Sequence, residues 1–372
     1  MFQHALVLAR SLSLVVLATT AIACSDDPPG KTSTSTTGEP PGLTCDANAG
    51  VSNVSGKNCG PLADDYTPRD AASANDSWSA CVSDGNQYVP FGKTTVSAAR
   101  VQAFHDIKEK LGFGGLNIPS PDDFKAARAL YTAVDGIESR VLEIEDDHFP
   151  AAPKACKDLT PDEQAQYPFR CVGPIRIRPI LDIAFEAGAR GEEPVINVAR
   201  IEAALLWFFY ASTYAEAVRA VDNPLFVDES WASYTGGETR DKPLGLAQYV
   251  QIRSVEAHDR IWDGLLALRC WRDLDNPSGP AMDLALQSRA IQQLDRALLR
   301  GIAVILRQRL EVMSCEPGWI SAEILAGILF REAQARDAAA AAVFIEELSR
   351  RRAALVNQEK LFTAMDTLFP CP

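Results

Sequence analysis

The chain has 372 residues, of which 36 are Lys or Arg and 49 are Asp or Glu, so its formal net charge at pH 7 is −13. Hydrophobic residues make up 47% and charged residues 23%, which are the proportions of an ordinary globular protein rather than of a disordered or fibrous one. The acidic balance argues against nucleic acid as a partner, because phosphate contacts need a cationic face.

The first 23 residues have the pattern of an export signal. A weakly positive start precedes the apolar stretch 11–23, which is too short to cross a bilayer but typical of a secretory signal. The four residues at 21–24, AIAC, resemble the lipobox of bacterial lipoproteins. The resemblance implies that a signal peptide, residues 1–23, is removed and that Cys24 carries acyl chains that anchor the protein in a membrane. The alternative is an ordinary secretory signal whose neighbouring cysteine has no special role.

The rest of the chain divides by composition into three parts. Residues 24–44 are mostly Ser, Thr, Pro and Gly with almost nothing to bury, so we expect a disordered tether. Residues 45–94 are rich in Gly, Asn, Asp and Ser, which indicates an irregular segment pinned by disulfides, and from 95 to 372 the pattern is helical. We expect an exported, anchored protein facing the periplasm or the cell surface. Ser25, which follows Cys24, favours the outer over the inner membrane.

The chain contains nine cysteines, and lipidation of Cys24 would leave eight, an even number in an oxidising compartment. We expect four disulfides among the eight cysteines that remain, which are Cys45, Cys59, Cys81, Cys156, Cys171, Cys270, Cys315 and Cys371. No CxxC pair occurs, which argues against zinc-ribbon or thioredoxin chemistry. The last predicted helix returns along its predecessor, so we expect Cys371 to come back towards Cys270.

Two further pairings follow from short separations in the sequence. Cys156 and Cys171 bracket a short segment that begins KDLTPDEQ, so we expect a local bridge between them. A bridge between Cys45 and Cys59 is a second expectation of the same kind. The other partners stay open, because sequence alone does not choose among the possible connectivities.

A helix is predicted to start at the sequence SPDD, residues 120–123. Ser120 is a good N-cap, proline suits the first turn, and two carboxylates face the positive end of the helix dipole. Apolar residues then recur at spacings of three and four, which predicts a buried helical stripe. The residues of this stripe are Ala127, Leu130, Val134, Ile137, Val141 and Ile144.

Similar periodicity continues through the rest of the chain. It predicts helices at 175–190, 195–221, 244–273, 280–313 and 320–368. The last of these contains an alanine run after Asp337, where the helix can break. The sequence LLWFFYASTY at 205–214 is apolar nearly all round, so we expect it in the central helix. Because no alternating strand pattern occurs, the fold class is all-α: a multi-helix bundle of six to eight helices with the irregular N-terminal segment packed on it.

One group of residues suggests a metal site. The sequence EIEDDH at 143–148 stacks carboxylates at a predicted helix C-terminus, where the dipole is already negative. Glu145 and His148 have the ExxH spacing that places both on one helix face, and His258 and Glu202 would complete a ligand set for zinc or non-haem iron. The favoured alternative needs no cofactor: arginines neutralise the acidic helix end, and His258 is a hydrogen-bonded core residue.

A long connection at 222–243 carries two aromatic residues and a glycine pair: Trp231, Tyr234, Gly236 and Gly237. Connections of this length within a compact domain are either functional or packed as an Ω-loop. The favoured interpretation is a packed, non-functional loop. The alternative is a ligand-facing lid with the two glycines as flexible points.

The sequence contains no dinucleotide fingerprint, P-loop, haem attachment site, zinc-protease motif or GxSxG elbow. We therefore favour a non-catalytic binding or interaction module that is anchored through acyl chains and presents a surface to a small ligand, a glycan or an envelope protein. The alternative, from a different class, is a metal-dependent enzyme or metal-uptake factor that uses the His148 and His258 region.

Overall fold

The computed structural model describes residues 59–69, 77–92, 96–115, 117–134, 136–350 and 352–371. The predicted signal peptide, Cys24, the tether and Cys45 lie outside these residues, so lipidation of Cys24 stays a prediction. Every regular element in the described ranges is helical and none is a strand, which confirms the predicted all-α fold. The described parts of the predicted irregular segment, 59–69 and 77–92, contain one short 3₁₀ turn and no α-helix.

The described residues form thirteen α-helices, more than the six to eight predicted, because several predicted helices are divided. They run over Val96–Leu111 (α1), Pro121–Tyr131 (α2), Ile137–Val141 (α3), Pro161–Gln164 (α4), Arg178–Ala189 (α5), Pro194–Arg219 (α6), Leu225–Thr235 (α7), Gly245–Gln251 (α8), Val255–Leu274 (α9), Leu284–Glu311 (α10), Glu316–Arg336 (α11), Ala338–Leu348 (α12) and Gln358–Leu368 (α13). Short 3₁₀ or π turns lie at Val82–Gly85, Cys156–Asp158, Gly173–Ile177 and Ala353–Leu355.

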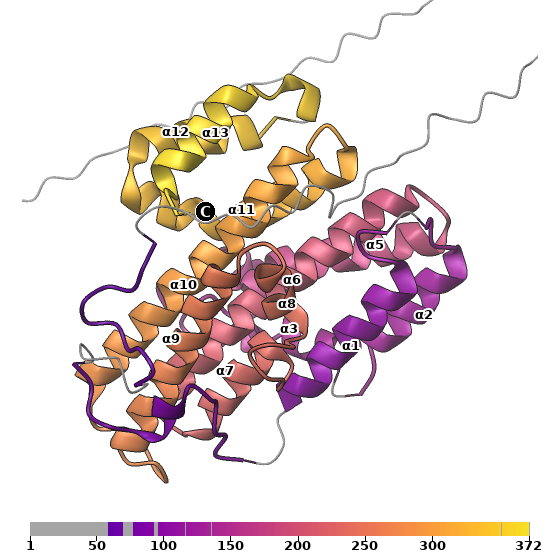
Figure 1. The fold of residues 1–372 in the computed structure, drawn as a ribbon. Coiled ribbons are helices and arrows are strands. Elements are labelled where there is room, and N and C mark those ends of the chain that lie inside the picture. The colour runs from indigo at the N-terminus through magenta and orange to yellow at the C-terminus, as the bar shows by residue number, and fades with distance from the viewer. Residues whose placement is uncertain are drawn as a thin grey trace, which may run out of the picture. The chain divides into compact units, whose positions relative to one another are not determined.

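Helix α6 lies in the middle of the bundle and packs against α5, α7 and α11 (Figure 1). Nearly all of its side chains between 197 and 217 are buried. Among the described helices only α6 is long and apolar enough to cross a membrane, but 83% of its apolar window is buried inside the protein. The apolar run at 205–214 therefore forms part of the core, as the sequence predicts.

Helices α9 and α10 pack side by side (Figure 1). Their close approach requires a glycine, because a Cβ added at Gly264 would lie only 2.8 Å from the Cα of Leu294. The predicted single helix at 244–273 is two helices, α8 and α9. The Ser254 hydroxyl caps α9 by accepting a hydrogen bond from the Ala257 amide at 3.1 Å, so a new helix begins there.

The predicted helix start at Ser120 is confirmed. The Ser120 hydroxyl accepts a hydrogen bond from the Asp123 amide at 3.3 Å, and the Asp123 carboxylate accepts one from the Ser120 amide at 2.8 Å, which together form a capping box. The predicted continuous stripe from 127 to 144 is wrong in its middle, because a turn separates α2 from α3. Val134, placed on that stripe, is 95% exposed. A Cβ at Gly136 would lie 2.6 Å from a backbone carbonyl oxygen, so the turn is too tight for a larger residue.

The predicted helix at 320–368 is divided into α11, α12 and α13. The break after α11 falls at Asp337, where the alanine run begins, as expected. The Asp337 carboxylate accepts hydrogen bonds from the amides of Ala339 and Ala340, both at 2.9 Å, and so starts α12 in a new direction. Helices α12 and α13 pack on each other, with α12 beside α11 (Figure 1).

The long loop predicted at 222–243 contains helix α7, so the loop prediction is wrong there. The helix packs against α6, and the Ser230 hydroxyl donates a hydrogen bond to the Thr213 carbonyl at 2.7 Å. Gly236, with φ of +75°, ends α7 in the left-handed conformation that favours glycine. At the start of α7 the Asn223 side chain accepts a hydrogen bond from the Leu225 amide at 3.0 Å, and Pro224 follows it. Asn followed by Pro is a usual signal for a helix start, and the loop prediction overlooked it.

The predicted bridge between Cys156 and Cys171 is confirmed: the two cysteines form a disulfide with their Cα atoms 5.5 Å apart. Both belong to a small separate apolar cluster with Leu159. This bridge closes a local loop of the kind that short spacing predicts.

The other two predicted pairings are wrong for the cysteines that the structure describes. Cys59 is paired with Cys371 rather than with Cys45, and Cys270 is paired with Cys81 rather than approached by Cys371. These partners are 312 and 189 residues apart in sequence. They meet because the irregular segment runs along α9 and α10, a long-range contact that sequence spacing does not reveal. Cys315 is also disulfide-bonded.

Candidate functional site

A cleft of about 670 Å³ opens where the C-terminal end of α7 meets the beginning of α9. Its wall is made by the irregular segment, the loop after α7, the end of α8 and one face of α9. The lining residues are Trp231, Gln251, Val255, Asp259, Trp262 and the runs 86–88 and 237–241. We call this hollow the α7–α9 cleft. Its volume lies in the range of small-molecule sites, roughly 300–1,000 Å³.

Three aromatic side chains form the apolar part of the α7–α9 cleft. Tyr88 and Trp231 are stacked, with ring centroids 4.4 Å apart and planes inclined by 9°. Trp262 is only 3% exposed and lies deeper, on α9. Large aromatic faces bury much area with few rotatable bonds, so they favour ligands that present a flat apolar surface.

Tyr88 is held in place from behind by a buried carboxylate. The Tyr88 hydroxyl donates a hydrogen bond to Asp228 Oδ1 at 2.8 Å, and the Gly92 amide donates to Asp228 Oδ2 at 2.7 Å. Burial raises the pKa of Asp228 above its usual value, although these hydrogen bonds favour the carboxylate. Burial, followed by the charge of Asp228, also raises the pKa of the Tyr88 hydroxyl, which therefore stays protonated. The ring of Tyr88 is thus fixed against Trp231.

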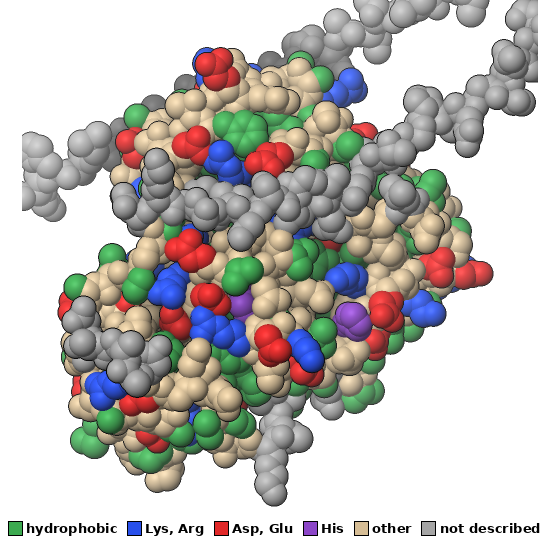
Figure 2. All heavy atoms as spheres, in the orientation of Figure 1, with side chains coloured by type: hydrophobic (Ala, Val, Ile, Leu, Met, Phe, Trp, Pro, Cys, Tyr) green, Lys and Arg blue, Asp and Glu red, His purple; other side chains and the backbone are tan. Residues whose placement is uncertain are grey.

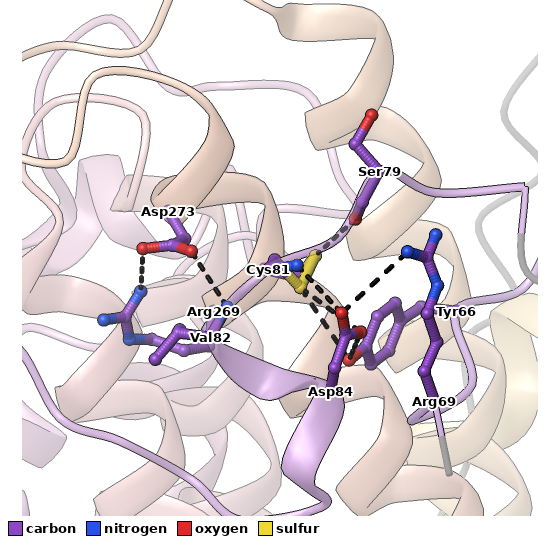
Figure 3. The surroundings of a disulfide bond; sticks show 9 residues. Tyr66, Arg69, Ser79, Cys81, Val82, Asp84, Arg269 and Asp273 are labelled. Atoms are coloured by element: carbon purple, nitrogen blue, oxygen red, sulfur yellow. Dashed lines mark hydrogen bonds and ion pairs between the residues drawn. A yellow bond between two sulfur atoms is a disulfide. The ribbon is translucent and has the colours of Figure 1, made fainter. Parts of the chain in front are cut away.

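The segment that carries Tyr88 is tied to α9 at several further points. Its disulfide joins Cys81 to α9, and the Val82 amide donates to Asp273 Oδ2 at 2.9 Å. Figure 3 shows Cys81 and Val82 beside Arg269 and Asp273. Arg269 Nε donates to the Val89 carbonyl at 2.5 Å. These contacts make the rim of the cleft a fixed part of the fold rather than a free loop.

Arg240 organises the polar side of the α7–α9 cleft. Its Nε and Nη2 atoms lie 2.9 and 2.7 Å from Asp259 Oδ1, and Nη1 donates to Asn86 Oδ1 at 2.5 Å. Its backbone carbonyl accepts a hydrogen bond from Gln251 Nε2 at 2.9 Å. One arginine therefore joins the loop after α7, the irregular segment, α8 and α9, and its charge is balanced by Asp259. A hydrogen bond from the Thr239 hydroxyl lowers the pKa of Asp241, which stays ionised at the rim.

His258 supports the Arg240 loop from inside the protein. Its Nε2 lies 2.9 Å from the Arg240 carbonyl oxygen, and its Nδ1 lies 3.1 Å from the Tyr234 hydroxyl. A carbonyl oxygen only accepts, so Nε2 carries the proton and Nδ1 accepts from Tyr234. Burial lowers the pKa of His258, which favours this neutral form. The prediction that His258 is a hydrogen-bonded core residue is confirmed.

The four residues predicted for a ligand-facing loop divide into two groups. Trp231 and Gly237 line the α7–α9 cleft, whereas Tyr234 is fully buried beneath it and Gly236 ends α7. Gly236 and Gly237 have φ values of +75° and +81°, a conformation that larger residues adopt only with strain. The two glycines turn the chain sharply from α7 into residues 238–241. Their role in the structure is to make this turn.

The residues of the predicted metal site each have other partners. Both ring nitrogens of His148 face carboxylates, Nδ1 at 2.6 Å from Asp146 and Nε2 at 3.0 Å from Asp295. Glu145 accepts hydrogen bonds from the Cys156 amide and from Arg170 Nε, both at 2.7 Å. Helix α3 ends at Val141, so the prediction that Glu145 and His148 share one helix face is wrong: both lie in the irregular stretch that follows. The carboxylates of that stretch are balanced by arginine, as the alternative interpretation predicts, because Arg170 pairs with Glu145 and with Asp147.

Glu202 lies in a different part of the core. It accepts hydrogen bonds from the Tyr249 hydroxyl at 2.7 Å and from Arg309 Nη2 at 2.8 Å. His258, as described above, binds Tyr234 and the backbone of Arg240. Within the described ranges no three His, Cys, Asp or Glu side chains are grouped so that they could hold a metal ion. The geometry therefore gives the zinc or iron hypothesis no support.

Sequence reasoning missed most of the α7–α9 cleft. Tyr88 and Asn86 lie in a segment without periodicity, and Arg240 and Asp259 are separated from it by more than a hundred residues. The signal that could have found them is the pairing of Cys81 with a helix of the bundle, because that bond brings residues 86–88 to α9. Sequence alone left that pairing open.

Comparisons of the chain with protein-family models, with curated proteins and with solved structures find no match. No relative therefore supplies a function. The chemistry of the described residues alone carries the functional interpretation.

Proposed function

We propose that the protein is an exported, lipid-anchored binding protein whose α7–α9 cleft takes a small glycan. The observation that carries the proposal is the stacked pair of Tyr88 and Trp231 beside a rim of carboxylate and amide side chains. Aromatic faces pack against the apolar C–H faces of sugar rings, and the hydroxyl groups of a sugar both donate and accept hydrogen bonds. Asn86, Glu238 and Asp241 offer such partners at the rim.

Preorganisation supports a binding role for the α7–α9 cleft. Tyr88 is fixed by Asp228, and Arg240 is fixed by Asp259 and by the backbone contact to His258. A rigid wall loses little conformational freedom when a ligand binds, so more of the contact energy remains as affinity. The disulfide between Cys81 and Cys270 contributes to this rigidity, because it ties the segment that carries Tyr88 to α9.

Titration calorimetry with trisaccharides of glucose and of N-acetylglucosamine tests the glycan proposal. We expect saturable binding that Trp231→Ala weakens at least tenfold, because the stacked face is lost. Phe169→Ala is the matched control, since Phe169 is an aromatic residue that is 50% exposed and does not line the cleft. Equal affinity of wild type and Trp231→Ala, or no binding of any sugar, would refute the assignment.

The anchor is tested separately, because Cys24 lies outside the described residues. Cells that express the protein are labelled with radioactive palmitate, and the protein is then isolated and counted. We expect label in the wild-type chain and none in Cys24→Ala. Label in both chains, or in neither, would contradict lipidation at Cys24 while leaving the α7–α9 cleft unaffected.

A further inference from the structure

A second hollow, of about 290 Å³, lies near the C-terminal end of the described chain and is lined by four arginines: Arg260, Arg296, Arg300 and Arg336. We call it the arginine pocket. Arg260 comes from α9, Arg296 and Arg300 from α10, and Arg336 from the end of α11. Among the described lining residues Asp65 is the one carboxylate.

The arginine pocket is held together by a covalent bond and by Arg300. The disulfide of Cys59 and Cys371 forms part of the wall. Arg300 Nη1 donates to the Cys59 carbonyl at 3.0 Å, and Nε donates to the Cys371 carbonyl at 3.2 Å. Glu256 balances the charge of Arg300 at 3.2 Å. The segments around Cys59 and Cys371, which are far apart in sequence, are thus held together at the edge of the pocket.

The other three arginines keep most of their donors. A guanidinium group has five N–H donors. Arg260 contacts Asp263 at 3.0 Å, and its buried Nε has no hydrogen-bond partner among the described residues. Arg296 pairs with Asp65, and Arg336 donates to Glu332 and to a backbone carbonyl. The remaining N–H donors of these partly exposed side chains are open to acceptor oxygens, either of water or of a ligand.

The positions of the carboxylate partners also affect which arginine N–H groups a ligand can reach. Asp263, Glu256 and Glu332 each contact one of the arginines, but none of them lines the pocket. They hold the guanidinium groups from the side while the remaining N–H groups stay available. On the face shown in Figure 2, acidic and basic side chains are interspersed. The pocket differs from that mixture, because it is lined by four arginines while three of their four carboxylate partners lie outside its lining.

We infer that the arginine pocket binds the phosphate group of a small ligand. Arginine recognises phosphate through paired, charge-assisted hydrogen bonds from two N–H groups of one guanidinium. Several guanidinium groups around one hollow offer several such pairs. A volume of about 290 Å³ is at the lower limit of ligand pockets, which suits one or two phosphate groups better than a large molecule. The site is separate from the α7–α9 cleft and does not depend on its ligand.

Titration calorimetry of the full chain with inorganic pyrophosphate, at constant ionic strength in chloride, tests the site. The test variant is Arg296→Gln with Arg336→Gln, whose side chains are 40% and 35% exposed, so that the fold is little affected. The matched control is Arg128→Gln with Arg190→Gln, two exposed arginines that each pair with one glutamate elsewhere. We expect binding to weaken at least tenfold in the test variant and to stay unchanged in the control.

A lysine version of the test variant separates charge from geometry. It keeps both positive charges but loses the paired N–H groups of the two guanidinium groups, so we expect an affinity between those of the wild type and the glutamine variant.

The source of the phosphate is distinguished by glycerophosphoglycerol, the soluble part of a lipid headgroup. Tighter binding of this probe than of pyrophosphate assigns a lipid headgroup, and the reverse assigns a free phosphate compound. No saturable binding of either probe, or equal weakening in test and control variants, overturns the inference.

Discussion

Substitution of His148 by glutamine removes a buried cation that joins α10 to the segment after α3. The two ring nitrogens lie 2.6 and 3.0 Å from Asp146 and Asp295, and the ring is stacked on Tyr214 with centroids 3.9 Å apart. Carboxylate oxygens only accept hydrogen bonds, so both ring nitrogens donate and the imidazole is positively charged. A glutamine keeps similar size and a donor but carries no charge.

The size of the effect follows from the proton affinity of His148. Burial by itself lowers the pKa, but the hydrogen bonds and charges of Asp146 and Asp295 outweigh it and raise the pKa from 6.5 to about 9. A tenfold change in proton affinity corresponds to about 1.4 kcal/mol, so the charged form stabilises the fold by ~3 kcal/mol. Because the folded-state pKa lies above the unfolded value, this contribution is complete below pH 6.5 and is lost as the pH rises through 9.

The assay is urea unfolding of wild type and His148→Gln between pH 6 and pH 9.5, with the disulfides intact. We expect the difference in unfolding free energy between the two proteins to shrink by about 3 kcal/mol over this range. His105→Gln is the control, because His105 is partly exposed and pairs with Glu109 on its own helix. A difference that stays constant with pH would show that His148 does not carry the proposed charge, and the reasoning would fail.

Three further substitutions test the packing of the helices by urea unfolding at pH 7. Glu202→Gln is expected to destabilise the fold by about 3–5 kcal/mol, because it removes the charge that balances the buried Arg309; a loss below 1 kcal/mol would contradict this. Gly264→Ala is expected to cost about 1–3 kcal/mol, because the new Cβ meets the backbone of Leu294, and an unchanged midpoint would argue against such close packing. Asp337→Ala is expected to cost about 1 kcal/mol through loss of the cap of α12, and no change would mean that the cap is not needed.

The features that the sequence predicts well depend on neighbouring residues. The capping box at Ser120 and the break at Asp337 each involve hydrogen bonds over two or three residues, so local chemistry alone determines them. The apolar run at 205–214 leads to the centre of the bundle because a helix without a polar face must be buried. The local bridge from Cys156 to Cys171 belongs to the same class.

The features that the sequence missed depend on contacts between distant residues. Val134 continues the apolar spacing of α2, yet it is exposed because the tight turn at Gly136 interrupts the helix. Helix α7 lies where a loop was predicted: its apolar residues lack a clear period, and its burial against α6 depends on a distant part of the chain. The cleft and the arginine pocket each contain a segment that a long-range disulfide ties to a distant part of the chain. Periodicity and capping carry no information about such pairings, so the candidate sites emerge only from the three-dimensional structure.

Asp263 links the two candidate sites. Its carboxylate lies 3.0 Å from Arg260 of the arginine pocket and 3.9 Å from Arg240 of the α7–α9 cleft. Burial nevertheless raises the pKa of Asp263 from 3.8 to about 6, which means that the two arginines do not fully compensate the loss of water. The ionised form therefore persists at neutral pH at a cost in stability.

The sign of that cost gives a measurable pH dependence. Because the folded-state pKa is above the unfolded value, the unfavourable contribution of Asp263 is present above pH 6 and disappears as the pH falls below about 4. From pH 4 to pH 6.5 we expect the unfolding free energy of wild type, relative to Asp263→Asn, to fall by up to ~3 kcal/mol. Asp122→Asn, an exposed change on α2, is the control for the common titration of carboxylates. If the unfolding free energy of wild type relative to Asp263→Asn rises with pH instead, the attraction of the two arginines outweighs the cost of burial. Asp263 is then a net stabilising bridge between the two sites.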